Sequence, residues 1–298
     1  MSSKRAVEML LGITGAAMCA VLIFSGTEAL ANPLGQADSV RGSGSIIYTT
    51  DRGIFSMRSD GSGVHRVLRF PYPEAVDISA EGGALTFDGP SSIYVKQRGR
   101  KPRRINTGDP DAGGRSRDPQ FSPNGRRVLY QGFRGITVSN LRGAHRKLVP
   151  FTSSATYASF NPKFPNTIVY EKATNFGERI WTSHLDGSNR RMLTPGRGVQ
   201  ASYPSYSPDG RSIVYIDWSS RNRTRLMVMD SDGSNKREVG KNVGGYLPRF
   251  SPDGNQIAII GSRRRQGIFV IGADGSGLKR ISKIRPWGID WGRLGGAR

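Results

Sequence analysis

The sequence predicts an all-β protein, a six-bladed β-propeller closed by pairing of its N- and C-terminal segments and preceded by a signal peptide. Two observations predict the ring. The first is a turn sequence, Ser-Pro-Asp-Gly or a variant of it, that begins at residues 79, 122, 161, 207 and 251. The second is the regular order of short β-forming runs between these turns. A repeat of about 40 residues that contains four strands is typical of a propeller blade.

Each repeat has the same internal order. A segment that ends in a large apolar residue precedes the turn, and two runs of β-branched, aromatic and other apolar residues follow it, as at 213–215 and 226–228. An Asp-Gly pair and a short basic segment complete most repeats. Runs of this composition between Gly, Pro, Asn and Asp indicate strands, and Asp-Gly between two runs is a strong hairpin signal. The sequence therefore predicts four strands per repeat.

The two ends of the predicted ring complement each other. Residues 45–68 contain the second, third and fourth strands of a repeat, whereas residues 287–291 resemble a first strand alone. We expect these segments to join into one blade, which makes six with the five internal repeats. Such pairing leaves no open sheet edge in the ring, and open edges favour aggregation.

The N-terminus predicts export. Lys4 and Arg5 precede an uncharged stretch at residues 9–24, and the small residues Ala29 and Ala31 suit a cleavage site, so we expect residues 1–31 to be a signal peptide cleaved after Ala31. The protein would then be periplasmic or extracellular. An uncleaved membrane anchor is the alternative, although the stretch is short for a membrane span.

The remaining organisation follows from these boundaries. Residues 32–44 are expected to be a linker, residues 45–292 the propeller and residues 293–298 a C-terminal tail. The single cysteine, Cys19, lies in the predicted signal peptide. The mature fold therefore needs no disulfide, and thiol chemistry is excluded.

The chain is strongly basic, with a formal net charge of +21. Much of the excess falls in the predicted fourth strands, which form the outer rim: Arg66, Arg103, Arg104, Arg146, Lys147, Arg190, Arg191, Lys236, Arg237, Lys279 and Arg280. One interpretation is a solvated rim whose charge blocks edge-to-edge pairing. The other is attraction to an anionic envelope polymer or to anionic lipid head groups. No nucleic-acid-binding motif is present, so nucleic acid is not an expected partner.

The sequence offers little that is typical of an enzyme. His65, His145 and His184 are expected to be held apart on the rim, and no nucleophile elbow of the Gly-x-Ser-x-Gly type occurs. We therefore predict no metal, no cofactor and no catalytic residue. A lyase or hydrolase that acts in the channel through carboxylates alone remains the alternative, and it would use Asp77 and Asp290.

The repeat resembles the WD40-like repeat of the TolB propeller family. The resemblance is most specific from Ser207 to Arg237, where Ser-Pro-Asp-Gly, Ile-Val-Tyr, Leu-Met-Val-Met and Asp-Gly-Ser-Asn follow one another, and it extends over residues 45–292. It implies a six-bladed propeller outside the cytoplasm. The family's namesake acts in the Tol–Pal cell-envelope system, where its propeller binds a peptidoglycan-associated lipoprotein. Because only residues 32–44 are expected between the signal peptide and the ring, we expect no counterpart of the α/β domain that precedes the propeller in TolB.

A column of polar residues is expected to line the channel. Alignment of the innermost strands on the turns places one polar residue of each blade two positions before the turn: Asp77, Gln120, Ser159, Ser205, Arg249 and Asp290. In ring order Arg249, Asp290 and Asp77 are neighbours and would form a charged sector. These side chains either satisfy one another, as buried polar groups require, or bind a small ligand, a cation or a loop of a partner.

A second group of residues is expected at the mouth of the channel, further upstream in the same strands: Asp118, Tyr157, Tyr203, Tyr246, Leu247 and Trp287. Tyr and Trp suit binding hot spots, because they combine a large contact area with a polar atom. Packing between blades is the alternative. The sequence as a whole predicts a monomeric, exported, non-enzymatic scaffold of the cell envelope whose protein partner docks at this mouth. Binding of an anionic polymer or lipid surface to the basic rim is the second hypothesis.

Overall fold

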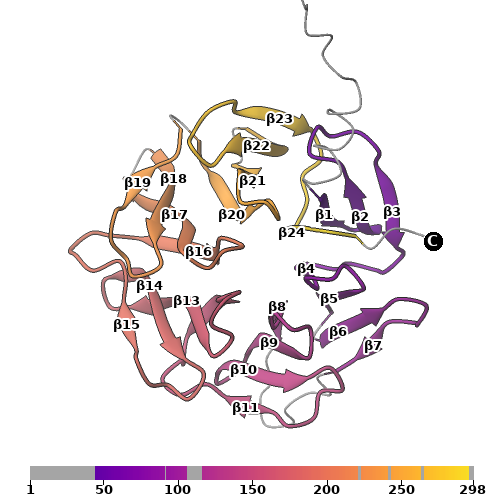
Figure 1. Ribbon diagram of the computed structural model, residues 1–298, viewed down its shortest axis with the longest axis horizontal. Coiled ribbons are helices and arrows are strands. Elements are labelled where there is room, and N and C mark those ends of the chain that lie inside the picture. The colour runs from indigo at the N-terminus through magenta and orange to yellow at the C-terminus, as the bar shows by residue number, and fades with distance from the viewer. Residues whose placement is uncertain are drawn as a thin grey trace, which may run out of the picture.

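The computed structural model describes residues 44–90, 92–105, 116–220, 223–240, 243–262 and 265–294. Within these ranges, 24 strands form six four-stranded sheets arranged as blades around a central axis (Figure 1). The all-β six-bladed propeller predicted from the repeat is confirmed. The predicted signal peptide and nearly all of the predicted linker lie outside the described residues. No helix in the described ranges is long and apolar enough to cross a membrane.

We number the blades by their first strands along the chain. Blade 1 consists of β4 (Val76–Ile78), β5 (Ala84–Gly89), β6 (Ser92–Gln97) and β7 (Arg103–Arg104). Blade 2 consists of β8 (Arg117–Phe121), β9 (Arg127–Gly132), β10 (Gly135–Asn140) and β11 (Lys147–Leu148). Blade 3 consists of β12 (Ala155–Phe160), β13 (Thr167–Thr174), β14 (Gly177–His184) and β15 (Arg191–Met192).

Blade 4 consists of β16 (Ala201–Tyr206), β17 (Ser212–Ser220), β18 (Arg223–Asp230) and β19 (Arg237–Glu238). Blade 5 consists of β20 (Gly245–Phe250), β21 (Gln256–Gly261), β22 (Ile268–Gly272) and β23 (Lys279–Ser282). Blade 6 combines β24 (Ile289–Gly292) with β1 (Ser45–Thr50), β2 (Gly53–Met57) and β3 (His65–Leu68).

The two termini close the ring as expected. Strand β24 pairs antiparallel with β1, so that Trp291 faces Ile46 and Ile289 faces Tyr48. These four side chains are almost fully buried and belong to one apolar cluster. Closure therefore depends on both a hydrogen-bonded ladder and a hydrophobic contact.

The repeated turn is held by its own side chains. In blade 4 the Ser207 hydroxyl accepts the N–H of Ser212 at 2.9 Å and donates to Asp209 at 2.6 Å. Gly210 donates its N–H to the Ser207 carbonyl and has a φ of 69°, which a glycine adopts without strain. Ser122 with Asn124, and Ser251 with Asp253, make the same contacts. The turn sequence thus connects first to second strands locally and identically.

The innermost strands of blades 2 to 5 carry a β-bulge. In each bulge, two consecutive residues of the first strand face a single residue of the second strand. The earlier of these two consecutive residues has a left-handed backbone: Asp118 (φ 51°), Tyr157 (φ 48°), Tyr203 (φ 59°) and Leu247 (φ 53°). In three of the four a proline follows. Proline lacks the N–H that a ladder needs, so it is tolerated at a bulge. The bulge turns the strand at the channel mouth.

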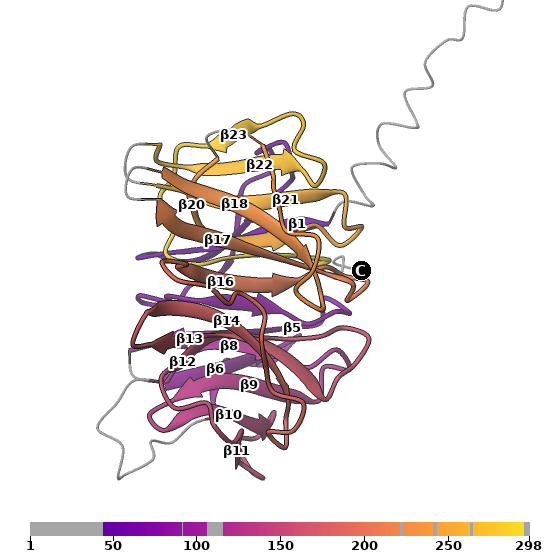
Figure 2. The same ribbon diagram turned by 90° about the vertical axis from the view of Figure 1, so that its left-hand side faces the viewer.

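All first strands run the same way, so the ring has two distinct faces. We call the face where they begin the mouth face; it also carries the hairpins between second and third strands. The opposite turn face carries the repeated turns and the hairpins between third and fourth strands. Figure 2 shows the ring from the side, with the strands running between these faces. Apolar side chains of neighbouring blades pack between the sheets, as Ile180 and Met227 do. The first strand of each blade is the innermost one and borders the channel (Figure 1).

Candidate functional site

The structure places all six residues of the polar column together in the channel. They line one cavity of about 490 Å³, which also borders Pro123, Pro162, Pro208 and Pro252 of the repeated turns. The cavity therefore lies on the side of the turn face. In blades 1 to 5 the polar residue lies two positions before the repeated turn, so a fixed offset from the turn predicts it, whereas Asp290 of blade 6 follows from the alignment of its strand with the others.

Two carboxylates of this cavity connect neighbouring blades. Asp290 of blade 6 accepts the backbone N–H of Ile78 in blade 1 at 3.0 Å, and Asp77 of blade 1 accepts that of Phe121 in blade 2 at 2.8 Å. A second oxygen of Asp290 lies 3.7 Å from Nε of Arg249. The predicted charged sector thus connects four successive blades, 5, 6, 1 and 2, and both carboxylates have structural partners.

Burial sets the protonation of this pair. It raises the pKa of Asp77 well above its ordinary value, and the neighbouring charge of Asp290 raises it further. Burial also raises the pKa of Asp290, although the Arg249 guanidinium opposes the change. A buried pair of like carboxyls with one cation close by favours retention of a proton on Asp77.

The channel narrows between its two ends. Gln120 and Arg249 border the large cavity and also a second one of about 20 Å³, which Asp118, Tyr157 and Leu247 line from the mouth side. A space of this size holds about one water molecule. The structure thus separates a roomy polar chamber on the turn face from an aromatic mouth on the other face.

Aromatic side chains gather at the mouth. Tyr203 is central: its ring centroid lies 4.5 Å from that of Tyr157 and 6.4 Å from those of Tyr246 and Trp218. Trp218 belongs to β17 and was not predicted as a site residue. The unusual length of the β-forming run that contains it was the available signal. The structure therefore brings three of the predicted mouth residues into one cluster with Trp218.

The other predicted mouth residues differ in where they lie. Asp118 and Leu247 line the small cavity together with Tyr157, and the three tyrosines pack against the apolar cluster that contains Leu247. Leu247 is only 8% exposed and packs in the apolar core between blades 5 and 6. Trp287 is 41% exposed and stacks on Tyr72, with ring centroids 5.9 Å apart. Tyr72, itself 59% exposed, precedes blade 1 in the connection from blade 6. This stacked pair presents an aromatic surface to solvent on the mouth face.

Buried carboxylates support the bulges behind the aromatic cluster. Asp88 accepts the N–H of Asp118 at 3.4 Å, and Glu171 accepts the N–H of Tyr203 at 3.1 Å. In both cases a second strand holds the bulged residue of the next blade. Burial raises the pKa of Asp88 to about 6 and those of Asp118 and Glu171 to about 7. Asp88 and Glu171 were not predicted, because they follow ordinary core aromatics in the second strands.

Further aromatics are exposed around the mouth face. Phe133 and Phe176 stand at the tips of the hairpins between second and third strands of blades 2 and 3, and Phe151 lies in the connection between those blades. The Phe151 ring lies 4.4 Å from the Arg190 guanidinium, beside the hairpin between the third and fourth strands of blade 3, whereas Phe133, Phe176, Tyr72 and Trp287 place four solvent-exposed aromatic side chains on the mouth face. Exposed apolar groups gathered on one face are a feature of interaction surfaces.

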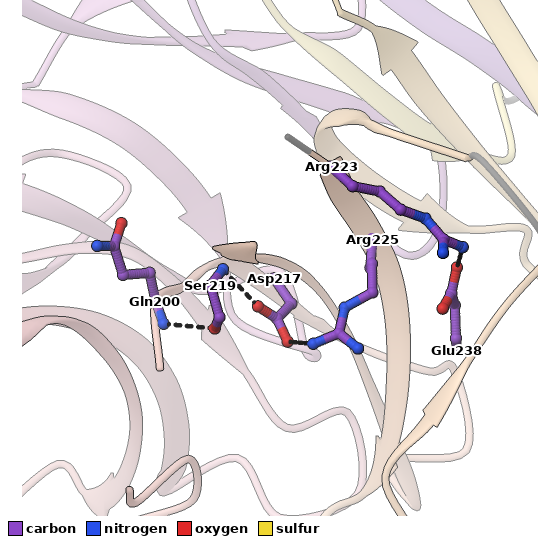
Figure 3. A network of polar contacts seen from close by, with 6 residues as sticks. All are labelled: Gln200, Asp217, Ser219, Arg223, Arg225 and Glu238. Atoms are coloured by element: carbon purple, nitrogen blue, oxygen red, sulfur yellow. Dashed lines mark hydrogen bonds and ion pairs between the residues drawn. The ribbon is translucent and has the colours of Figure 1, made fainter. Parts of the chain in front are cut away.

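The longest hairpin of the ring, β17–β18, is fixed by polar contacts next to Trp218 (Figure 3). Asp217 accepts the N–H of Ser219 at 2.7 Å and forms a 2.6 Å ion pair with Arg225. The Ser219 hydroxyl in turn accepts the N–H of Gln200 at 2.9 Å. These contacts tie the hairpin to the strand that carries Tyr203.

The sequence predicted that the three histidines are held apart on the rim, and the structure shows that this is wrong for two of them. His145 and His184 come from neighbouring blades and line the same cavity of about 430 Å³ near the rim, whereas His65 contacts Ser56 in blade 6. The expectation treated each blade alone and missed that the end of one sheet lies beside the next. Among the described residues, no group of three His, Cys, Asp or Glu side chains is placed to hold a metal ion.

Comparison with known proteins agrees with the fold. The chain matches no protein-family model. It is 26% identical over 162 residues to the Tol-Pal system protein TolB of Francisella tularensis subsp. mediasiatica, a match that covers 50% of this chain and 36% of that protein. The chain thus spans about a third of the length of that relative.

Two solved structures illustrate the similarity in three dimensions. A putative TolB from Agrobacterium tumefaciens superposes with a TM-score of 0.68 at 17% identity, over 83% of this chain and 93% of the other. An oligogalacturonate lyase in complex with manganese gives 0.57 at 11% identity, over 76% of this chain and 70% of the other. The chain is a TolB-like six-bladed propeller, and the same architecture also occurs in an enzyme.

Proposed function

We propose that this chain is an exported, non-enzymatic scaffold of the cell envelope that binds a protein partner on its mouth face. The observation that carries the proposal is the aromatic surface of that face, in which Tyr203 and its neighbours lie at the channel mouth and four further aromatics are exposed. Large aromatic side chains dominate the energetics of protein–protein interfaces.

The form of the mouth supports docking over packing alone. Asp118, Tyr157, Tyr203 and Leu247 hold left-handed backbones that cost about 1–3 kcal/mol each for residues other than glycine. Such strain is often concentrated at functional sites. The distant similarity to the Tol-Pal system protein TolB also favours a partner in the envelope.

A catalytic role in the channel has weaker support. Both carboxylates on which it would depend, Asp77 and Asp290, accept backbone N–H groups of the next blade. Carboxylates held in this way serve the contact between blades. We therefore assign them a structural role in the proposal.

A capture experiment tests the docking proposal. The mature chain, residues 32–298, is immobilised and incubated with solubilised cell envelope at low and at high salt. We expect a discrete protein to be retained at high salt, because docking on aromatic side chains depends little on ionic strength. The same protein should be lost when Tyr72 and Trp287 are both replaced by alanine.

Phe164 provides a matched control. It is 66% exposed and lies on the turn face, so Phe164→Ala removes a comparable aromatic from the opposite side of the ring. This variant should retain the partner at the wild-type level. Equal retention by the Tyr72→Ala/Trp287→Ala chain, or retention of proteins at low salt only, would contradict docking on the mouth face.

A further inference from the structure

Two basic cavities lie on either side of the β10–β11 hairpin, at the outer edge of the turn face. The first, of about 590 Å³, is formed between blades 1 and 2 and is lined by the cationic side chains Arg100, Lys101, Arg103 and Arg142. The second, of about 430 Å³, is formed between blades 2 and 3 and is lined by Arg127, His145, Lys147 and His184. Consecutive residues of one hairpin, Asn140 and Leu141, contribute to the two cavities.

Several of these side chains are held in position. Arg103 donates to the Leu141 carbonyl at 2.7 Å, across the boundary of blades 1 and 2. Arg127 donates to the Pro165 carbonyl at 3.1 Å, and its guanidinium lies 5.7 Å from the centre of the Phe160 ring. A guanidinium fixed through one nitrogen keeps other N–H groups for a ligand. The cavities are therefore partly pre-organised.

Among the described residues that line the two cavities, one side chain is acidic, that of Asp186 in the second cavity. Asp186 accepts the N–H of Ser188 at 2.9 Å and its hydroxyl at 2.6 Å, within its own turn. Asp186 keeps its negative charge, so the first cavity, whose described lining has four cationic side chains and no acidic one, is the more positive of the two. Asn166 and Ser139 add neutral polar groups to the second cavity, and such groups suit the hydroxyls of a sugar.

His145 occupies its position at a cost. It has a φ of 54° in the hairpin between third and fourth strands, and the equivalent residues of four other blades are Gly63, Asn189, Asn235 and Gly277, all with positive φ. Glycine and asparagine adopt this backbone more readily than histidine. The positive φ belongs to this turn in all five blades, so the reason to consider His145 as a ligand contact is its position in the second cavity beside Arg127 and Lys147.

We propose that these two cavities bind a single chain of a linear acidic polysaccharide whose charges are carboxylates. Guanidinium groups recognise carboxylates through paired hydrogen bonds. Because only the β10–β11 hairpin separates the two cavities, neighbouring sugar units of one polysaccharide chain can occupy both. Cavities of about 430 and 590 Å³ have room for sugar units, whereas a flat lipid surface would meet only their rims. This site is distinct from the mouth face and does not depend on the function proposed there.

Binding of a fluorescently labelled oligogalacturonate to residues 32–298, followed by fluorescence anisotropy, tests the proposal. Four substitutions are combined: Arg100→Gln, Arg142→Gln, His145→Asn and Lys147→Gln. Asparagine suits the backbone of residue 145, so the hairpin should persist. We expect the affinity to fall about tenfold or more, because three cationic side chains are removed from the two cavities together with the ring of His145.

A control variant removes similar charge from blade 5, where Lys279, Arg280 and Lys283 are exposed. Replacing these three by glutamine should lower the affinity less than twofold. Thermal denaturation confirms that both variants are folded. Equal losses in the two variants would show a diffuse effect of net charge and overturn the assignment to the cavities.

The choice of probe separates the ligand classes. A neutral oligosaccharide should not compete with the labelled probe. Tighter binding of polyphosphate that responds to the same four substitutions would overturn the carboxylate assignment in favour of a phosphate polymer. Absence of binding to oligogalacturonate at low salt would overturn the proposal altogether.

Discussion

Asp118 illustrates how a single half-buried carboxyl contributes to the pH dependence of this fold. Its pKa is raised to about 7, first by burial and then by the charge of Asp88, whose side chain accepts the Asp118 N–H. The value in an unfolded chain is about 4. Folding therefore favours the protonated form, and the corresponding stability is complete below about pH 4 and is lost as the pH rises through about 7.

The substitution Asp118→Asn should remove this penalty. Asparagine cannot ionise, and it tolerates the left-handed backbone of the bulge. We expect the free energy of unfolding to increase by about 2 kcal/mol near pH 8 and to change little near pH 4. Urea denaturation at both pH values measures the difference.

Asp209 offers a control of opposite sign. The Ser207 hydroxyl lowers the pKa of this exposed turn carboxylate, so its stabilisation is present above the unfolded pKa and is lost as the pH falls. Asp209→Asn should therefore give no gain near pH 8, and Asn124 shows that asparagine fits the same turn. An Asp118→Asn protein with the wild-type pH profile would show that the Asp118 carboxyl is hydrated.

At the scale of the element, the inner strand is the unit that carries both sites. Its bulge turns residues such as Tyr203 toward the mouth, and the residues between bulge and turn present the polar column to the large cavity. Both features lie on one strand of six residues, β16 in blade 4. The long β17–β18 hairpin then adds Trp218 to the mouth.

The Asp217–Arg225 ion pair should matter for this hairpin. Asp217 is nearly buried, and its carboxylate contacts both Arg225 and the N–H of Ser219. We expect Asp217→Asn to destabilise the protein by about 1–2 kcal/mol, because the Arg225 charge loses its partner. Amide hydrogen exchange in residues 215–228 should accelerate more than exchange in the rest of the ring.

The neighbouring Arg223–Glu238 pair is a matched comparison in the same hairpin. Arg223 is 42% exposed, and exposed pairs contribute at most about 1 kcal/mol. Arg223→Gln should therefore leave hydrogen exchange in residues 215–228 close to that of the wild type. Similar acceleration by both substitutions would contradict a special role for Asp217.

At the scale of the molecule, the ring depends on a contact between its two ends. Strand β24 supplies the inner strand of blade 6 and places Ile289 and Trp291 in the core. It also supplies Asp290, which binds the backbone of blade 1 and Arg249 of blade 5. Closure and the charged sector of the channel are therefore one structural feature.

A chain that ends at Gly288 should lose cooperative folding. Without β24, strand β1 exposes an unpaired edge and the core of blade 6 is open to water, both of which favour aggregation. Size-exclusion chromatography and thermal denaturation report the loss. A chain that ends at residue 294 keeps β24 and should behave as the full chain, whereas a monomeric, cooperatively folded protein ending at Gly288 would refute the role of closure.

The sequence by itself determined the number of blades, the four strands of each and the polar column of the channel. These features are local or periodic: Ser207 and Asp209 close a turn with their own side chains, and the turn recurs at similar spacing in blades 1 to 5. The position of Asp77 or Ser205 relative to its turn could therefore be read without knowledge of the neighbouring blades. Binding at these residues remains a prediction.

Only the tertiary structure decided which residues of different blades meet. It joined Asp290 to Ile78 and Glu171 to Tyr203, added Trp218 to the mouth, and brought His145 and His184 to one cavity. Proline at 119, 204 and 248 was a signal for the bulges, but the left-handed backbone is a product of the strand's pairing. Contacts across blades depend on how the sheets pack around a closed ring, and the repeat of a single blade does not contain that information.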